Sequence, residues 1–403
     1  MSDQTAALRA TLRRLALPIY VPWFGVAFGT AMLLPILPVY LTDLGLSFTS
    51  ATVVLAATGV GATASGLPLG AALSRVGERA LLVASILLSA VSAALLGASG
   101  VIAVLVMLRL GTGVGSMGMR LAQQTHIART VDSSQRGRAM SLMGGTARAG
   151  IFVGPFVGGA LTDLTSPETT FVAAATVMVA GLVPDLLVNR RADEHALDEP
   201  TPQPSGDDEP TPSMAGHWRR LVTIGIGPAL ITAVRSGRLI VIPLIADDLG
   251  LSATAVGAVV AIGTGADLML FPVAGWLMDR HGRLFATVPA FTLMGIGLLL
   301  LGTVDSTIGV VIAGTVIGIG NGMSSGTMLT IGSDVAPAGV RAPFLAGLGS
   351  MQDLGRIIGP LIVGWFADAA GLDASAVALA VAMFIGVAWL ILVIGETRDL
   401  QLG

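Results

Sequence analysis

Long apolar stretches alternate with short clusters of charged and turn-forming residues along the whole chain. Breaking the sequence at these clusters leaves segments of about 20 to 27 residues, the length a helix needs to cross a hydrocarbon layer of about 30 Å. Lipid offers no partner for backbone polar groups, and the short alternating segments of a barrel are missing, so each segment is predicted to be a helix. The twelve predicted spans are residues 16–41, 50–74, 79–99, 101–126, 138–162, 168–189, 220–246, 252–278, 284–303, 306–331, 341–366 and 373–395.

The composition indicates a membrane protein with many spans. Of 403 residues, 53% are hydrophobic, 12% are charged and 53 are glycine, which is far too apolar for a soluble protein of this length. Arg9, Arg13 and Arg14 precede the first apolar run, which is longer than the core of a cleavable signal, so we expect it to stay as the first span. The predicted fold class is an all-α membrane protein with twelve transmembrane helices.

The arginines outside the predicted spans all fall on one side if both termini are cytoplasmic, and the opposite loops carry acids instead. Because cytoplasmic loops are enriched in basic residues, this distribution predicts a protein of the cell membrane with both termini in the cytoplasm. The sixteen arginines are Arg9, Arg13, Arg14, Arg75, Arg79, Arg129, Arg136, Arg138, Arg190, Arg191, Arg219, Arg220, Arg280, Arg283, Arg341 and Arg398, and the opposing acids include Asp43, Asp163, Asp248, Asp305 and Asp368.

One segment, residues 190–218, differs in composition from the rest, being rich in Asp, Glu, Pro, Ser and Thr. Such a segment cannot bury apolar surface, so it is predicted to be a mobile cytoplasmic linker. The chain is then divided into an N-terminal six-helix bundle, residues 1–189, and a C-terminal six-helix bundle, residues 219–403.

A constant offset of 205 residues relates the two halves, which is hard to obtain by chance over most of a chain. Two parallel repeats of this kind imply a site between them near the membrane midplane and transport by alternating access. The offset takes Pro38 to Pro243, Gly70 to Gly275, Arg75 to Arg280, Gly77 to Gly282, Gly154-Pro155 to Gly359-Pro360 and Asp163 to Asp368.

Glycines are concentrated in a decamer inside the fifth predicted span. Gly150, Gly154 and Gly158 are four residues apart, so they share one helical face against which another backbone can lie closely, and Gly159 follows directly. Pro155 removes one backbone donor and favours a bend. This helix is therefore predicted to pack tightly and to flex.

Several classes of chemistry lack the residues that they need. Cysteine and lysine are both absent, which excludes disulfides, a Walker A phosphate loop and a Schiff-base site. The four histidines have no metal-binding spacing, and we find no nucleophile–base cluster. We therefore expect no enzyme activity, cofactor, metal or nucleic-acid partner, and an ion gradient as the source of energy for any uphill movement.

Charged residues inside the predicted spans are functional candidates, because burying one at the bilayer centre costs at least about 2.5–3.5 kcal/mol. Most of them fall ten to sixteen residues into their spans, near mid-depth at 1.5 Å per residue. The arginines are Arg109, Arg120, Arg148, Arg235, Arg238 and Arg356, and the acids are Asp267 and Asp353.

Two interpretations of these charges remain open. In one, Asp353 pairs with Arg356 or Arg148, Asp267 pairs with Arg235 or Arg238, and the pairs only hold the structure together. In the other, the excess of arginine attracts an anionic substrate while an aspartate takes up a coupling proton. The predicted substrate-binding residues are Arg148, Arg235, Arg238 and Arg356 with Phe24 and Phe28, and the predicted proton-coupling residues are Asp267 and Asp353.

The motifs together resemble those of the major facilitator superfamily over nearly the whole chain. Residues 275–283, GWLMDRHGR, are similar to its cytoplasmic signature, and residues 70–79, GAALSRVGER, repeat it with Ser74 in place of the usual aspartate. The resemblance implies that these loops gate the conformational change and that Arg109 takes part in proton coupling. The predicted gate residues are Gly70, Arg75, Gly77, Gly275, Asp279, Arg280, Gly282 and Arg283.

The decamer also resembles a pattern of twelve-span drug/proton antiporters. The resulting hypothesis is a monomeric secondary transporter in the lipid bilayer that exports a small amphipathic or anionic compound in exchange for protons. The alternative is a facilitator or proton symporter that imports a small organic anion or nutrient. A sensor or enzyme that has lost transport is a third possibility, for which the sequence offers no site.

Overall fold

A computed structural model describes residues 19–187, 216–337 and 339–397. Within these ranges every regular element is a helix, which confirms the predicted all-α class. Some sequence-based predictions lie outside the described residues. They concern the cytoplasmic arginines Arg9, Arg13, Arg14, Arg190, Arg191 and Arg398 and the predicted linker up to residue 215.

The first six predicted spans correspond to eight α-helices and one 3₁₀ turn. The first span is broken into two helices at residues 33–35, and the sixth at residues 181–182. The elements are α2 (Val21–Met32), α3 (Ile36–Asp43), α4 (Phe48–Val76), α5 (Glu78–Ala94) with the 3₁₀ turn η2 (Leu95–Ala98), α6 (Ile102–Thr130), α7 (Ser133–Leu164), α8 (Pro167–Ala180) and α9 (Val183–Leu187).

The last six spans repeat this order, but here the tenth span is the broken one. Its two helices meet at residues 324–326, where Gly326 has a positive φ of 81°. The elements are α11 (Trp218–Asp248), α12 (Ala253–His281), α13 (Arg283–Leu301), α14 (Thr307–Met323), α15 (Thr327–Val335), α16 (Arg341–Ala370) and α17 (Leu372–Trp389) with the π-helical turn η5 (Leu390–Ile394).

Ten spans in the described residues are long and apolar enough to cross a membrane. The two others, α7 and α16, are long enough at 32 and 30 residues, but are not among the ten. Arg148, Asp353 and Arg356 lie in their central turns, and charged side chains lower the mean hydropathy of a helix. These two helices also carry the repeated glycine decamer.

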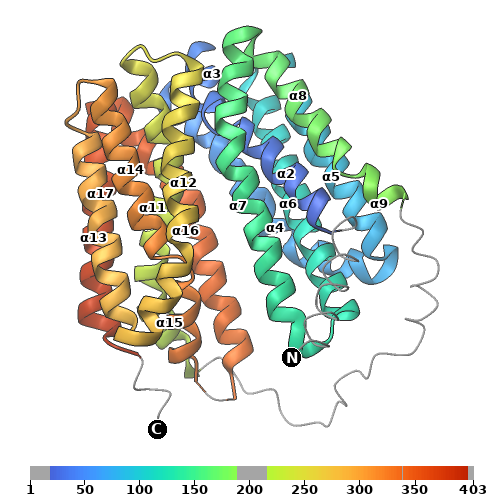
Figure 1. Cartoon of the computed structure of the whole chain (residues 1–403), viewed down its shortest axis with the longest axis vertical. Helices are drawn as coiled ribbons and strands as arrows, with labels where there is room; N and C mark the ends of the chain where they lie inside the picture. Colours follow the sequence, from blue (N-terminus) through green and yellow to red (C-terminus); the bar gives the residue numbers. More distant parts are fainter. Residues whose placement is uncertain (1–18, 188–215, 338, 398–403) are drawn as a thin grey trace.

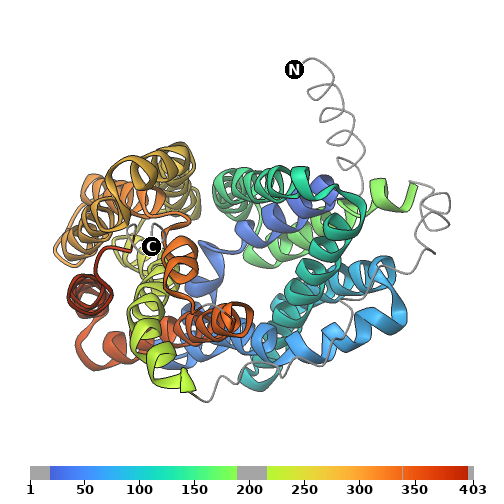
Figure 2. The same ribbon diagram turned by 90° about the horizontal axis from the view of Figure 1, so that it is seen from below.

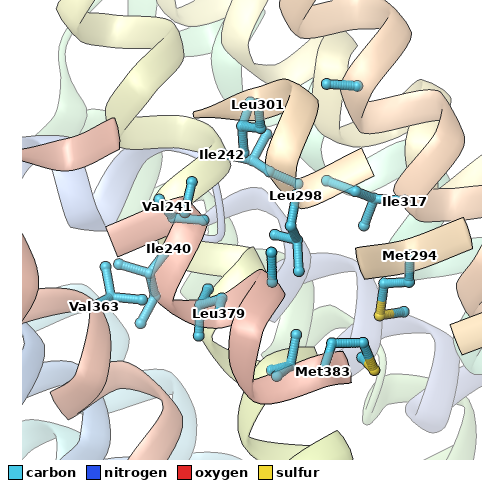
Figure 3. Close-up of a cluster of buried hydrophobic side chains, with 14 of the residues drawn as sticks. Ile240, Val241, Ile242, Met294, Leu298, Leu301, Ile317, Val363, Leu379 and Met383 are labelled. Carbon is cyan, nitrogen blue, oxygen red and sulfur yellow. The ribbon is translucent and has the colours of Figure 1, made fainter. Parts of the chain in front are cut away.

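The helices form two bundles that lie side by side (Figures 1 and 2). Helices α2–α9 make one bundle and α11–η5 the other, and the main contacts between them are α7 with α12 and α4 with α16. Each bundle has its own apolar core. In the C-terminal bundle, side chains of α11, α13, α14, α16 and α17 meet there, including Val241, Leu298, Ile317 and Leu379 (Figure 3).

The two ends of the molecule differ in charge. Because consecutive spans run in opposite directions, the described loop arginines, such as Arg75 and Arg280, gather at one end, which we call the arginine-rich end. Asp163 and Asp368 lie at the other, which we call the acidic end. The bundles touch at the acidic end, at the top of Figure 1, and diverge towards the arginine-rich end.

Candidate functional site

The glycine ridge of α7 packs on α2 of the same bundle. A Cβ on Gly154 would clash with the backbone oxygen of Phe28, and one on Gly158 with the backbone of Met32. Gly359 of α16 lies in the same way against Ala233 of α11. Only glycine allows this approach of two backbones, as the sequence predicted, and it fixes α7 and α16 to the first helix of their own bundles.

The last glycine of each decamer touches the other bundle instead. A Cβ on Gly159 would clash with the backbone of Ala253 at the start of α12, and one on Gly364 with the Thr52 side chain and the Phe48 backbone in α4. These positions are related by the 205-residue offset. The decamer therefore joins α7 or α16 both to the first helix of its own bundle and to the other bundle, with the last glycine at the acidic end.

Two aspartates reinforce this contact between the bundles. The Asp163 carboxylate accepts hydrogen bonds from the backbone N–H groups of Ala253 (3.0 Å) and Thr254 (2.8 Å). Asp368 accepts from the backbone N–H groups of Phe48 (2.9 Å) and Thr49 (2.8 Å). The first N–H groups of a helix have no partner within it and carry partial positive charge, so a carboxylate there is favourable.

At the arginine-rich end, the described glycines make no such contact with the other bundle. A Cβ on Gly70 or Gly275, near the ends of α4 and α12, would meet no atom within 4 Å. About midway along the helices the bundles are still in contact, where Gly59 approaches Ile357 and Gly265 approaches Phe152. The structure is therefore closed at the acidic end and open at the arginine-rich end.

Where this opening reaches mid-depth, an arginine of one bundle contacts the other. The Arg148 guanidinium of α7 lies 4.0 Å from the ring centroid of Phe271 in α12. A guanidinium over an aromatic face is attracted by about 0.5–2 kcal/mol. Arg148 also interacts electrostatically with Arg235 of α11. The predicted residues Arg148 and Arg235 thus belong to one site between the bundles.

Asp267, in α12, takes a different partner from those expected. Its carboxylate accepts hydrogen bonds from the side chains of Asn321 (2.5 Å) and Ser325 (3.4 Å), at the break between α14 and α15. In the described part of the chain it forms no ion pair with Arg235 or Arg238, although it interacts with both electrostatically. The expected pairing is wrong because the broken tenth span supplies nearer polar groups.

Arg235 and Arg238 are one helical turn apart on α11 but have different surroundings. The Arg235 Nη2 donates to the backbone oxygen (3.2 Å) and the hydroxyl (2.6 Å) of Ser324, and its guanidinium lies 5.3 Å from the Phe291 ring centroid. Arg238 is 7% exposed, and its guanidinium forms no hydrogen bond within the described residues. The Nε atoms of both arginines are buried without a partner.

Asp353 and Arg356 form an ion pair on one face of α16, as one of the two interpretations predicted. Both side chains are partly exposed, at 28% and 49%. Arg356 has a second charged neighbour, Arg120 of α6, with which it interacts electrostatically. No described hydrogen bond or ion pair joins this pair to Asp267 and its partners, so the predicted charges divide into two groups.

Two other predicted features lie away from both groups. Arg109 of α6 is enclosed, its Nε has no partner, and no described hydrogen bond joins it to the carbonyls of the first span. The reason is that α6 packs mainly on α4 and α5 rather than on α2. Phe24 and Phe28 of α2 stack with ring centroids 5.7 Å apart, and Phe24 is 37% exposed, so both can contribute an aromatic surface.

The predicted gate residues occupy short connections at the arginine-rich end. Gly77 and Gly282 have positive φ angles of 81° and 104°, which allow α4 and α12 to turn directly into the next helix. Arg283 donates to Asp334 within its own bundle (2.9 Å). No described hydrogen bond or ion pair of Asp279 reaches the other bundle.

The site also contains residues that the sequence did not predict, namely Phe271, Asn321, Ser324 and Ser325. The last three belong to the run Asn-Gly-Met-Ser-Ser-Gly at residues 321–326, a polar and glycine-rich interruption in an apolar span. Such interruptions mark binding sites in many transporters, because an unwound segment exposes backbone groups. That signal was present in the sequence, whereas the position of Phe271 under Arg148 depends on how the bundles face each other.

The charged residues of this site are mainly basic. Arg235 and Arg238 both interact electrostatically with Asp267, and Arg148 interacts with Arg235, so the four residues carry a formal charge of about +2 when all are ionised. The Asp353–Arg356 pair adds no net charge. An anionic ligand would therefore lower the electrostatic cost of burying these arginines, whereas a cation would raise it.

Comparison with known proteins agrees with this architecture. The family model described as Major Facilitator Superfamily matches residues 23–342 and 224–401. No curated protein sequence matches the chain.

Many solved structures share the fold. One is a bacterial homologue of the human lysosomal transporter Spinster, in an inward-facing, unoccupied conformation, with 13% identity, a TM-score of 0.74 and coverage of 93% of this chain and 95% of that one. Another is a POT family transporter in complex with a thioalcohol-conjugated peptide, with 14% identity, a TM-score of 0.74 and coverage of 94% and 96%. At these identities the likeness concerns the fold alone.

Proposed function

The chain belongs to the Major Facilitator Superfamily, a family of membrane transporters rather than enzymes, and we propose that it carries a small organic anion by proton-coupled alternating access. The observation that supports this most directly is the group of Arg148, Arg235, Arg238 and Asp267, which are linked by electrostatic interactions and of which Arg238 is buried. We take the arginine-rich end to be cytoplasmic, following the distribution of loop arginines. The open end then faces the cytoplasm.

Asp267 is the proposed proton carrier. When ionised, its carboxylate and a substrate anion compete for the field of Arg235 and Arg238. Protonation removes that competitor, so the proton and the anion should strengthen each other's binding. Positive coupling of this kind favours movement of both in the same direction, which is symport.

Export by proton antiport is the second candidate. The decamer at residues 150–159, with its antiporter-like pattern, favours it. In an antiporter, proton binding must weaken substrate binding, and here the Asp353–Arg356 pair would have to carry the coupling. The two candidates therefore place the coupling proton on different helices.

The test is transport in proteoliposomes under an imposed pH gradient, with radiolabelled organic anions. Symport predicts accumulation on the side to which protons flow, antiport predicts depletion from that side, and no gradient dependence for any anion would contradict proton coupling. Arg235→Ala should abolish transport while leaving a folded protein. Asp353→Asn should abolish coupling only under antiport, and normal turnover would show that its pair with Arg356 is structural.

A further inference from the structure

Two arginines from different bundles, Arg120 of α6 and Arg356 of α16, interact electrostatically, and we call them the arginine pair. Arg356 has an ion-pair partner in its own helix, Asp353. Arg120 is partly buried, and its Nη2 donates only to the Met117 sulfur (2.8 Å), which is a weak acceptor. No described ion pair joins Arg120 to an acid, so its guanidinium keeps most of its capacity to bind an anion.

The internal repeat places Arg120 beside the space between the bundles. The 205-residue offset takes Arg120 to Ser325, whose hydroxyl donates to Asp267. The same offset takes Arg148 to Asp353. Two repeats of this kind are related by a pseudo-twofold axis that runs between them. The charges around the arginine pair are therefore the counterparts of those around Asp267, on the opposite side of this axis.

One face of α4 brings the arginine pair together. Gly59 and Gly66 lie two turns apart on this face. A Cβ on Gly59 would lie 2.9 Å from the Ile357 side chain of α16, and one on Gly66 would lie 3.0 Å from the Met117 side chain of α6. Each contact residue is next to, or one turn from, an arginine of the pair. Helices α6 and α16 thus approach the same face of α4 from different bundles.

The charges of the arginine pair oppose closure of the arginine-rich end. Arg120 lies in the half of α6 nearer that end, and Arg356 lies at the centre of α16. The bundles diverge here (Figure 1), so closure has to bring the two helices closer together. Like charges repel at short range, and Asp353 is bound to only one of the two arginines. An anion between the arginines would turn this repulsion into attraction.

We propose that the arginine pair binds one anionic group of the substrate between the bundles, and that this bound anion allows the arginine-rich end to close. A carboxylate suits this position, because its two oxygens can accept hydrogen bonds from guanidinium groups on both sides. The assignment rests on the proposed function, because it concerns the same transported anion. It adds Arg120 as a binding residue and links binding to the conformational change.

Charge variants of Arg120 test the repulsion without any ligand. Spin labels on Val76→Cys and Ala342→Cys, exposed positions at the arginine-rich ends of α4 and α16, would measure the opening by double electron–electron resonance. Arg120→Gln should raise the ratio of closed to open molecules at least about twofold, because it removes the repulsion. Arg120→Glu should raise it further, because the new carboxylate is attracted to Arg356. Unchanged distances in both variants would overturn the proposal.

Two further variants show whether the effect belongs to this position. Arg129→Gln is the matched control, because it removes another arginine of α6 whose charge is bound to Glu78 in its own bundle. It should leave the label distances unchanged, and a shift equal to that of Arg120→Gln would overturn the proposal. Arg356→Gln removes the other member of the pair and frees Asp353 to attract Arg120, so it should also favour closure. This variant decides the matter if the Arg120 variants do not fold.

Acetate is the probe for the anion site, because it carries the carboxylate alone. Compared with sodium chloride at equal ionic strength, sodium acetate should raise the closed fraction of the labelled protein further, since a carboxylate can accept two hydrogen bonds at once. Arg120→Gln should abolish the difference between the two salts. Equal effects of both salts on the protein with Arg120, or an acetate effect that persists in Arg120→Gln, would overturn the anion site.

The outcomes separate this inference from the proposed function. Closure that depends on acetate and on Arg120, without gradient-driven transport of any organic anion, would contradict the proposed function alone. Gradient-driven transport that is as fast in Arg120→Gln as in the unmodified protein would contradict this inference alone.

Discussion

Asp163 and Asp368 occupy equivalent positions in the two halves, and each carboxylate caps the first turn of a helix in the other half. Asp163 binds the backbone N–H groups of Ala253 and Thr254, and Asp368 binds those of the equivalent residues in α4. Each capped helix also has its own serine cap, such as Ser252 in α12. The first-turn donors are thus shared between the two bundles, which links helix capping to closure of the acidic end.

Removing one of these caps should favour opening of the acidic end. Loss of a side-chain cap costs about 0.5–2 kcal/mol, or roughly a 2- to 30-fold change in the ratio of closed to open molecules. Asp163→Ala and Asp368→Ala should each have an effect of this size, with Asp43→Ala, an exposed acid at the same end, as the control. Spin labels on Leu44→Cys and Ile308→Cys would measure the distance between the bundles, since the chain has no native cysteine.

The same caps should not respond to pH in the physiological range. Burial would raise the pKa of Asp163, but hydrogen bonds from Thr254, Ser252 and Ala253 outweigh this effect and lower the pKa below 3.8. Equivalent hydrogen bonds lower the pKa of Asp368. Because the pKa is lowered in the closed state, the carboxylates stabilise the closed end at every pH above the ordinary pKa of aspartate. This stabilisation is lost as the pH falls through the lowered pKa. The label distance should stay constant between about pH 5 and pH 8, and opening within that range would show another titrating group.

Asp267→Asn should separate binding from coupling. The amide has nearly the same shape; its oxygen can accept the hydrogen bond from Asn321, and its NH2 group can donate to the Ser325 hydroxyl oxygen, so the protein should fold and bind its substrate. It cannot exchange a proton, so gradient-driven accumulation should fall to the equilibrium level while exchange of labelled for unlabelled substrate continues. Retained accumulation in this variant would assign the coupling proton elsewhere.

The glycine ridge of α7 should not accept a large side chain. Gly154→Leu would drive a side chain into Phe28 and Ala31 of α2, and overpacking typically costs 1–3 kcal/mol, with more expected where backbone atoms cannot move. Gly145→Leu on the same helix is the control, because a Cβ there would meet no atom within 4 Å. Size-exclusion chromatography should show loss of monodisperse protein only for Gly154→Leu.

Two ion pairs at the arginine-rich end occupy equivalent positions in the two halves, with the acidic and the basic residue exchanged. Arg283 binds Asp334 in the C-terminal half, and Glu78 binds Arg129 in the N-terminal half. Asp334→Ala leaves a nearly buried arginine without this partner and should lower stability by about 3–5 kcal/mol. Arg129→Ala should cost less than about 1 kcal/mol, because the Arg129 side chain is 45% exposed. Thermal unfolding of both variants would compare the two losses.

Much of the fold followed from local composition. The apolar content of each span decides that it enters lipid, and the absence of backbone partners in lipid decides that it is helical. The 205-residue offset also predicted that Gly154 and Gly359 would make equivalent contacts, which they do. The hydrogen bonds of Asp163 and Asp368 follow the same offset, although the sequence marked them only as loop acids.

The site followed from the sequence only in part. Membrane charges pointed to Arg148, Arg235, Arg238 and Asp267, because charge in lipid is costly wherever the chain then folds. The partner of Asp267 could not be predicted from that cost, since Asn321 is 54 residues away and reaches it only through the packing of α12 on α14.

The sequence by itself therefore determined the number of spans, their pairing into two repeats and the residues whose charge needs a partner. Tertiary structure decided which hydrogen-bond partner Asp267 has, that Arg238 makes no hydrogen bond within the described residues, and that the acidic end is the closed one. The physical reason is range: transfer into lipid depends on each segment alone, whereas hydrogen bonds and packing between bundles depend on atoms brought together from distant parts of the chain.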